Sequence, residues 1–130
     1  MKAVTSIAVS ISALCFAAIS YAQNAAPTLE DTEWGPENGL GQYIQFKSGG
    51  EVFGFGGCNT FIGNYTQKGD KIDVTTIGAT KKLCEDMQGA EMAFIEGLKN
   101  AHTLKMTETD LRVYNAKGKW ILGMRQRDVK

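Results

Sequence analysis

The sequence has 130 residues, with 14 basic and 14 acidic side chains, so its net charge at pH 7 is zero. A chain without an excess of positive charge lacks the electrostatic basis for binding nucleic acid. The length suffices for one domain with its own hydrophobic core. The sequence therefore predicts a single small domain that binds no nucleic acid.

The N-terminus carries the pattern of a signal peptide at residues 1–22. Lys2 precedes an uncharged run at residues 3–20, and Ala22 is a small residue at the expected cleavage site. A retained segment of this length could span a bilayer, but its serines make it a weak anchor. We expect cleavage before Gln23 and export of a soluble chain to the periplasm or the medium.

Lipid attachment at the signal peptide is not expected. Cys15 lies inside the apolar run, and Leu14 stands before it, where a bacterial lipid-attachment site needs a small residue. This cysteine is therefore lost with the signal peptide, and no membrane anchor is expected to remain after cleavage.

Beyond a leader at residues 23–28, short runs rich in β-branched and aromatic residues alternate with glycine or asparagine turns. This pattern is typical of antiparallel strands. It predicts a domain at residues 29–126, with a tail at 127–130. The predicted fold class is mainly β with one helix (α+β), a small antiparallel, barrel-like curved sheet of about eight strands. Strands are expected at residues 29–34, 43–46, 51–55, 60–65, 71–75, 103–106, 111–114 and 120–124.

Residues 86–101 have the pattern of a helix, inserted before the last three strands. Asp86 is expected to cap its N-terminus and to interact favourably with the positive end of the helix dipole. Gly89 and Gly97 each weaken the helix by about 1 kcal/mol, so it should depend on packing against the sheet. The predicted apolar face comprises Met87, Phe94, Ile95, Leu98 and Ala101.

A glycine-rich stretch surrounds the cysteine–asparagine pair at residues 58–59. A phosphate-binding loop of the type G-x-G-x-x-G needs glycine at position 59 and a helix behind it, and both are missing from the pattern. Glycine within strands instead marks bends, bulges and close approach. Gly56 and Gly57 are therefore predicted to bend one strand into the next, while Gly54 and Gly63 leave room for aromatic neighbours.

Cys58 and Cys84 are the cysteines that remain after signal cleavage. In an exported protein such a pair indicates one disulfide, and the spacing is not that of a C-x-x-C redox motif. In the chain-entropy model, the bond stabilises the fold by about 3–4 kcal/mol. We predict a structural disulfide that ties the glycine-rich bend to the segment before the helix.

Catalytic chemistry finds little support in the residue types. Ser48 and His102 are the one serine and the one histidine after residue 22. A catalytic triad would need them to meet, and Ser48 lies in a Lys-Ser-Gly-Gly turn, where serine is ordinary. No ligand spacing around His102 supports a metal site. We predict no catalytic residue, cofactor or metal; the carboxylate spacing neither favours nor excludes a glycosidase pair.

Residues 55–65 read F-G-G-C-N-T-F-I-G-N-Y, and residues 80–84 read T-K-K-L-C. The first run resembles the G-C-N-x-[FY]-x-G-x-Y signature of the META domain family, also called HslJ-like. The second resembles the T-x-x-x-C element of that family, which precedes a helix with a Phe-Ile-x-x-Leu pattern, as at residues 94–98. The residues that carry the resemblance are Gly56, Gly57, Cys58, Asn59, Phe61, Gly63, Tyr65, Thr80 and Cys84.

The resemblance implies a small antiparallel, barrel-like fold with one helix. It also implies an exported protein of the cell envelope, in a family whose members are linked to heat shock, drug tolerance, secretion or motility. It implies no established catalysis and therefore no catalytic residues. The chain departs from many members because it lacks a lipid-attachment cysteine, so outer-membrane anchoring is not implied here.

The leading hypothesis for function is a non-enzymatic envelope protein, monomeric, that binds an unknown envelope protein partner or maintains envelope proteins under stress. One alternative is a secreted protease inhibitor that acts through residues 23–28. Another is a carrier of a small apolar ligand, which needs an open barrel interior. The packing of six large side chains distinguishes the carrier from the others: Trp34, Phe46, Phe53, Phe61, Phe94 and Trp120.

Overall fold

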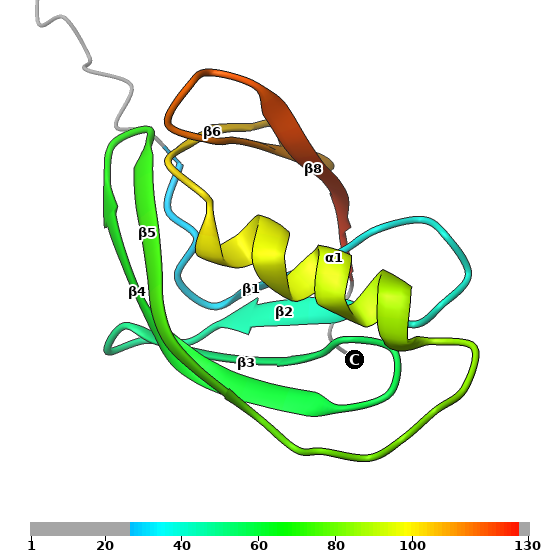
Figure 1. Ribbon diagram of the computed structural model, residues 1–130. Helices are drawn as coiled ribbons and strands as arrows, with labels where there is room; N and C mark the ends of the chain where they lie inside the picture. The colour runs from blue at the N-terminus through cyan, green and yellow to red at the C-terminus, as the bar shows by residue number, and fades with distance from the viewer. Residues whose placement is uncertain (1–26, 128–130) are drawn as a thin grey trace, which may run out of the picture.

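Eight antiparallel strands form a closed, barrel-like ring in the computed structural model, which describes residues 27–127 (Figure 1). Consecutive strands pair with one another, and β1 pairs with β8 to close the ring. Helix α1, Gln88–Lys99, precedes the last three strands, so the predicted fold class is confirmed. The strands are β1 Thr32–Gly35, β2 Tyr43–Phe46, β3 Glu51–Phe55, β4 Thr60–Lys68, β5 Lys71–Ala79, β6 Thr103–Met106, β7 Asp110–Tyr114 and β8 Trp120–Gln126.

Several sequence predictions concern parts of the chain outside the described residues. These parts are the signal peptide at residues 1–22, residues 23–26 of the leader and residues 128–130 of the tail. Within residues 27–127, no helix combines the length and the apolar character needed to cross a membrane.

Alternating side chains of the strands fill the interior of the ring. Ile44 and Phe46 of β2 are buried, as are Leu111 and Val113 of β7, whereas Arg112 between them is exposed. A slip of one residue would turn these side chains to solvent, so the apolar pattern fixes the register. The core consists of Leu29, Trp34, Ile44, Phe46, Val52, Phe61, Ile72, Val74, Phe94, Leu98, Ala101, Leu104, Leu111, Val113 and Met124.

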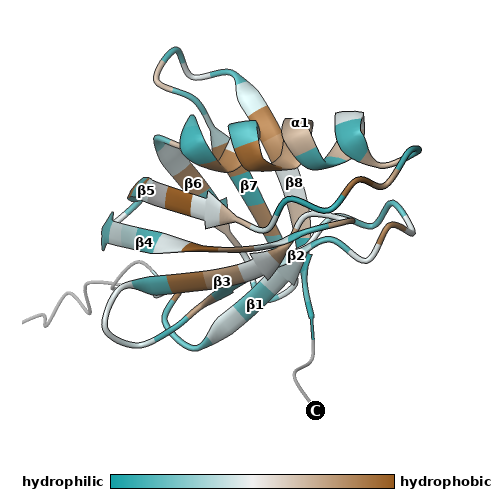
Figure 2. Cartoon of the chain, turned by 60° about the horizontal axis from the view of Figure 1, so that its bottom comes forward, coloured by the Kyte–Doolittle hydropathy of each residue, from teal (hydrophilic) through white to brown (hydrophobic). Residues whose placement is uncertain are grey.

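Helix α1 lies beside the seam between β5 and β6, where the strand pairing is shortest. The register of this pair has one matched position, at Lys71 of β5. The helix contacts β5 and β8, lies over one side of the ring (Figure 2), and buries Phe94 and Leu98. Gly97 permits this approach, because a Cβ there would lie 2.8 Å from Cγ of Leu122 in β8. The glycine that weakens the isolated helix therefore serves its packing.

Several strand limits differ from the prediction. β1 begins at Thr32 and not at residue 29, because the preceding residues form a turn in which Asp31 has a φ of 59° and Thr32 N–H donates to the carbonyl oxygen of Leu29. β4 extends to residue 68, because its turn into β5 consists of Gly69 and Asp70 alone. β5 extends to residue 79, because it pairs with β4 as far as Phe61. β8 continues to residue 126, where it pairs with β1.

The predicted cap of the helix is wrong. The N-cap residue is Met87, not Asp86, and its side chain makes no capping hydrogen bond. The chain enters the helix through a turn in which Met87 N–H donates to the carbonyl oxygen of Cys84 at 3.1 Å. The start of α1 is therefore set by contacts of this preceding segment, which the sequence pattern of the helix does not contain.

Replacing Gly54 by alanine should destabilise the protein. A Cβ at this position would overlap the ring of Phe61 and the carbonyl oxygen of Tyr43, so an already filled core would be overpacked. We expect a loss of about 1–3 kcal/mol, which thermal unfolding would detect as a melting temperature lower by about 5–15 °C.

Gly78→Ala is the matched control for this prediction, because Gly78 also lies in a strand. A Cβ there would lie 4.0 Å from Cγ1 of Ile62, an ordinary contact. This variant should retain the melting temperature of the natural protein. Equal losses in both variants would show that strand glycines matter here for a reason other than space.

Candidate functional site

Residues 56–59 form the tight connection between β3 and β4, with a 2.8 Å hydrogen bond from the N–H of Gly56 to the carbonyl oxygen of Asn59. Gly57 has a φ of 113°, which L side chains rarely adopt. A Cβ at Gly57 would also strike the terminal methyl group of Met87. Glycine is therefore required at position 57 by the backbone and by the neighbouring segment.

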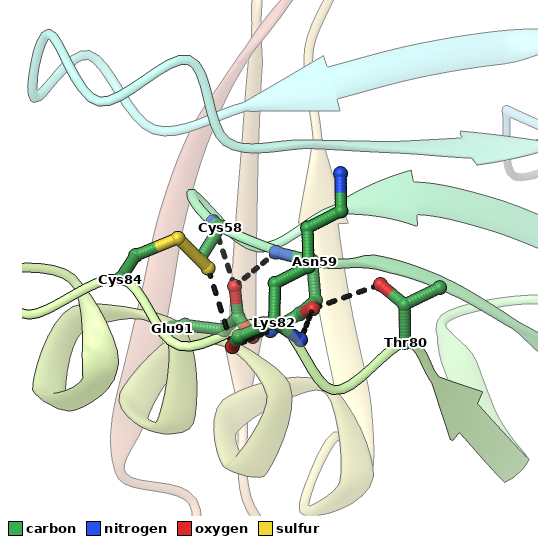
Figure 3. The surroundings of a disulfide bond; sticks show 6 residues. All are labelled: Cys58, Asn59, Thr80, Lys82, Cys84 and Glu91. Atoms are coloured by element: carbon green, nitrogen blue, oxygen red, sulfur yellow. Dashed lines mark hydrogen bonds between the residues drawn. A yellow bond between two sulfur atoms is a disulfide. The ribbon is translucent and has the colours of Figure 1, made fainter.

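A disulfide joins Cys58 in this connection to Cys84, which lies between β5 and α1 (Figure 3). The two Cα atoms are 5.9 Å apart, within the usual range for this bond, and the sequence separation is 26. The bond therefore links the β3–β4 hairpin to the long segment that leads into the helix.

Asn59 places its side-chain amide at the centre of the same cluster and is 6% exposed. Its Oδ1 accepts from the hydroxyl of Thr80 at 2.8 Å and from the N–H of Lys82 at 2.6 Å. Its Nδ2 donates to Oε1 of Glu91 at 2.7 Å and to the carbonyl oxygen of Lys82 at 3.2 Å. These four bonds use the full capacity of the amide, so no other side chain of this size could replace it.

Glu91, in the first turn of α1, brings a carboxylate to the glycine-rich connection (Figure 3). Its Oε2 accepts from the backbone N–H groups of Cys58 and Asn59, each at 2.7 Å. Gly56 makes this approach possible, because a Cβ there would lie 2.6 Å from Cγ of Glu91. Burial raises the pKa of Glu91, but the hydrogen bonds from Asn59 and Cys58 outweigh it and hold the pKa below its usual value.

Gln42, just before β2, forms a second link between the hairpin and the helix. Its side chain is almost fully buried, and its Nε2 donates to the carbonyl oxygens of Gly56 at 2.8 Å and Ala90 at 3.1 Å. Its Oε1 accepts from Nδ2 of Asn38 at 2.8 Å. Strand β2, the hairpin and α1 therefore meet at one polar cluster. We call the set Gln42, Cys58, Asn59, Thr80, Cys84 and Glu91 the corner cluster.

The remaining residues of the signature lie in β4, away from the corner cluster. Phe61 is fully buried and packs edge-on against Phe94 of the helix, with ring centroids 6.1 Å apart. Tyr65 packs against Phe46 at 4.9 Å. Gly63 lies where the register of β4 and β5 shifts, which is the position of a β-bulge. These residues shape the core and the curvature of the sheet.

The residues considered for catalysis do not come together. Ser48 is exposed in the turn between β2 and β3, and His102 is exposed in the connection from α1 to β6. No hydrogen bond joins their side chains among residues 27–127. The same part of the chain contains no group of three histidine, cysteine or acidic side chains arranged to hold a metal.

The chain matches a known family over most of its length. Residues 28–128 match the family described as META domain. The chain belongs to the META domain family. No curated protein matched the chain. The resemblance stated from the glycine-rich run and the T-x-x-x-C element is thereby confirmed.

Two solved structures share the fold of this META domain. An NMR structure of a protein from Burkholderia xenovorans has a TM-score of 0.63 and 20% identity, covering 78% of this chain and 85% of that chain. A crystal structure of a DUF4847 family protein from Bacteroides vulgatus ATCC 8482 has a TM-score of 0.54 and 21% identity. The match covers 70% of this chain and 62% of that chain. At these identities the similarity shows the fold and not a shared activity.

The corner cluster of this META domain is suited to holding segments together. The oxygens of Glu91 are already engaged, and a carboxylate with a lowered pKa is a weak proton acceptor. Glu91 and Gln42 were not anticipated from the sequence. An acidic residue in the first turn of the predicted helix was the available signal for Glu91, but Gln42 is far from the signature in the chain and carried no such signal.

Replacing Cys58 by alanine should lower the melting temperature by about 10 °C or more, because losing a native disulfide from a small secreted domain costs about 2–5 kcal/mol. Cys84→Ala and the double variant should show the same loss, since each removes the same bond. Calorimetry measures the loss, and thiol labelling under denaturing conditions measures the bond. Two free thiols in natural protein purified from an oxidising compartment would contradict the structural role.

Glu91→Gln should lower the free energy of unfolding at pH 7 by about 1–3 kcal/mol, because a charged acceptor of three hydrogen bonds is lost. The folded-state pKa of Glu91 is lowered, so its contribution is complete above the unfolded pKa of about 4.3 and disappears as the pH falls through the folded value. The difference in the free energy of unfolding between the natural protein and Glu91→Gln should therefore become smaller in acid.

Glu96→Gln is the matched control on the same helix. Glu96 forms an exposed ion pair with Lys99 at 3.8 Å, and exposed pairs contribute about 0–1 kcal/mol. Denaturant unfolding between neutral pH and pH 3 measures the free energy of unfolding of both variants and of the natural protein. A difference between the natural protein and Glu91→Gln that grows in acid would refute the role assigned to Glu91.

Proposed function

We propose that this protein is a non-catalytic domain, exported to the cell envelope, that binds a protein partner through the outer face of β2, β3 and β4. The family match supports a small non-enzymatic domain. The signal pattern at residues 1–22 and the Cys58–Cys84 disulfide support export, because disulfides persist in oxidising compartments. The observation that carries the proposal is an apolar patch on the outside of the ring.

The patch consists of Tyr43, Phe53, Phe55 and Ile62, which we call the outer aromatic face. Their inward-facing neighbours in the strands are buried in the core, so these four side chains point outward. The ring of Tyr43 lies 6.4 Å from those of both Phe53 and Phe55, and Phe53 stands opposite Ile62 in the sheet. Ile62 is 62% exposed. β3 is therefore apolar on both faces. Figure 2 shows much of this strand in the colours of hydrophobic residues.

The surroundings of the outer aromatic face resemble those of protein interfaces. A hollow of about 300 Å³ adjoins Phe53 and Ile62 on one side, and another of about 270 Å³ adjoins Ile62 on the other. Lys47 lies over the ring of Phe53 at 5.5 Å, and Arg127 lies over that of Tyr43 at 4.8 Å. Aromatic residues with arginine at the rim are enriched at interfaces, and hollows accept the anchoring side chains of a partner.

The closed ring favours contact through side chains. β1 and β8 pair with each other, so neither is available for adding a partner strand along the paired positions. A partner that needs an apolar platform, whether one fixed envelope protein or segments of envelope proteins exposed under stress, would be held by the same outer face.

No comparable structural observation supports the two alternative functions, a carrier of an apolar ligand and a secreted protease inhibitor. The interior that a carrier would need is filled within the described residues, since Trp34, Phe46, Phe61 and Phe94 are buried there. Phe53 lies on the outside, and Trp120 is exposed on the far side of the ring. The candidate inhibitory segment at residues 23–28 has only its last two residues among those described.

Photo-crosslinking in cells tests the proposed function. Benzoylphenylalanine placed at position 62 in the full-length protein should yield one discrete crosslinked species, identified by mass spectrometry. Adding Phe53→Ser should abolish that species, because the platform for the partner is removed. N-terminal sequencing of the crosslinked protein should begin at Gln23, as export requires.

The control position is Leu83, which is 85% exposed but lies outside the outer aromatic face. Crosslinker at position 83 should give no discrete species. The same products at positions 62 and 83, or a product at 62 that survives Phe53→Ser, would show that the outer aromatic face selects no partner.

A further inference from the structure

A second feature lies on the other side of the ring, on the outer face of β6, β7 and β8. The core residues Leu104 and Val113 point inward, so Lys105 and Arg112 point outward, directly opposite each other in the sheet. Gly123 of β8 stands opposite Arg112 on its other side. Two cations therefore share a surface next to a position without a side chain.

This pair of cations is not neutralised by the protein. Like charges directly opposite in a sheet repel each other. Among residues 27–127, no carboxylate lies within ion-pairing distance of Lys105 or Arg112. Each cation instead lies over an aromatic ring, Lys105 at 5.7 Å from that of Tyr114 and Arg112 at 5.3 Å from that of Trp120. Contact with a ring stabilises a cation but leaves its charge available to an anion.

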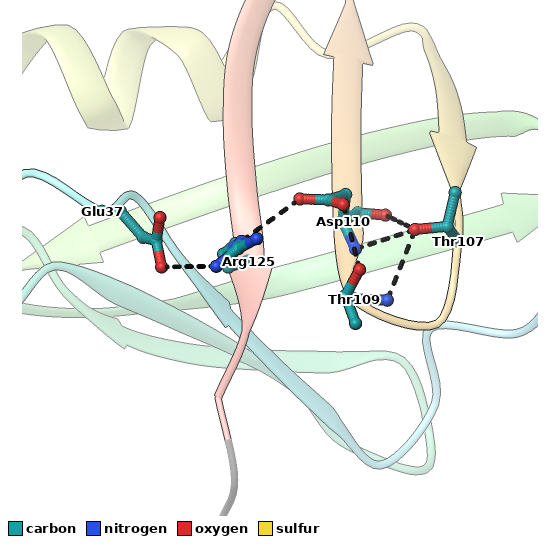
Figure 4. Close-up of polar contacts among 5 residues, drawn as sticks. All are labelled: Glu37, Thr107, Thr109, Asp110 and Arg125. Atoms are coloured by element: carbon teal, nitrogen blue, oxygen red, sulfur yellow. Dashed lines mark hydrogen bonds and ion pairs between the residues drawn. The ribbon is translucent and has the colours of Figure 1, made fainter.

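Arg125, unlike Arg112, is neutralised by the protein. Arg125 lies between two carboxylates, 3.1 Å from Glu37 and 3.5 Å from Asp110 (Figure 4). The hydroxyl of Thr109 donates to the other oxygen of Asp110 at 3.0 Å. The positive charge of Arg125 is thus offset, and the carboxylates do not reach the charge of Arg112. The unbalanced charge on this face is that of Arg112 and Lys105.

The aromatic wall of this face is held in place. Trp120 is 57% exposed, yet its Nε1 donates to the carbonyl oxygen of Leu122 at 2.9 Å, which fixes the indole. The ring lies beside Gly123, where a Cβ would be 2.9 Å from Cζ2. A large exposed side chain that is already fixed loses little conformational entropy when it binds a ligand.

Trp120, Arg112 and the Arg125 ion pairs surround one hollow of about 210 Å³. Its size is below the range of about 300–1,000 Å³ that is usual for drug-sized ligands, so one ring-sized unit fits it. Its walls combine a flat aromatic surface, an available guanidinium and carboxylate oxygens that can accept hydrogen bonds from hydroxyl groups. An apolar ligand would make no use of these polar groups.

We propose that this hollow binds a sugar unit that carries a carboxylate. The C–H face of the sugar ring packs against the indole of Trp120, and its hydroxyl groups bond to Asp110 and Glu37. The carboxylate pairs with Arg112 and relieves the repulsion between Arg112 and Lys105. This site is separate from the outer aromatic face and does not depend on the proposed protein partner.

NMR titration of the full mature chain tests the proposal, with the indole N–H of Trp120 as the probe and that of buried Trp34 as the internal reference. D-Glucuronic acid should shift the Trp120 signal and leave that of Trp34 in place. D-Glucose, which lacks the charge, should bind about tenfold or more weakly, because a charge-assisted contact is missing. An oligomer of galacturonic acid distinguishes a unit within a polysaccharide from a free sugar acid by binding more tightly.

Two charge variants complete the test. Arg112→Gln should weaken glucuronate binding by about tenfold, whereas Lys117→Gln, which removes an exposed cation from the β7–β8 turn, should leave it unchanged. Both substitutions are on the surface, and unchanged signals from the core verify the fold. The proposal is overturned if acetate shifts Trp120 with the same affinity as glucuronate, if both variants lose affinity equally, or if Trp120 does not respond.

Discussion

The contact between the carboxylate of Glu91 and the N–H groups of Cys58 and Asn59 fixes where the helix lies on the ring. It joins the first turn of α1 to the β3–β4 hairpin, in addition to the packing of Phe94 and Leu98 against the ring. Bringing a carboxylate into a partly buried position is unfavourable unless its oxygens are satisfied. Three donors satisfy them here, and two glycines give the space and the backbone shape that these donors need. The glycine-rich run is therefore an anion-binding corner whose anion is part of the protein.

The disulfide and this polar contact hold the same segments by different means. The covalent bond restricts the unfolded chain, whereas the hydrogen bonds of Asn59 and Glu91 stabilise one folded arrangement. Cys58 and Asn59 are adjacent, so the disulfide and the hydrogen bonds hold the same short piece of backbone. A shift of the hairpin would therefore disturb both together.

The sequence predicts most of the fold, because the alternation of inward and outward side chains along a strand is a local pattern. β2, β3 and β6 have the predicted limits, since each is bounded by a clear turn signal. The start of the helix could not be predicted in this way. Asp86 is a residue type that favours the N-cap, but the N-cap residue in the structure is Met87. The contacts that hold the first turn come from Asn59 and Cys58, far away in the chain. The partners of Asn59 and the link through Gln42 are tertiary features that no local pattern contains.

The pairing of β1 with β8 has a consequence for how the chain folds. Most strand pairs join neighbours through short turns, so their loop-closure entropy is small and they form early. The β1–β8 pair joins the two ends of the domain and the β5–β6 pair spans the helix, so these two contacts have high contact order. Until both form, the strands make two separate sheets, β1–β5 and β6–β8, each with two free edges, and the aromatic β3 remains exposed on both sides. Ring closure is therefore the late step that separates the folding chain from an aggregation-prone open sheet.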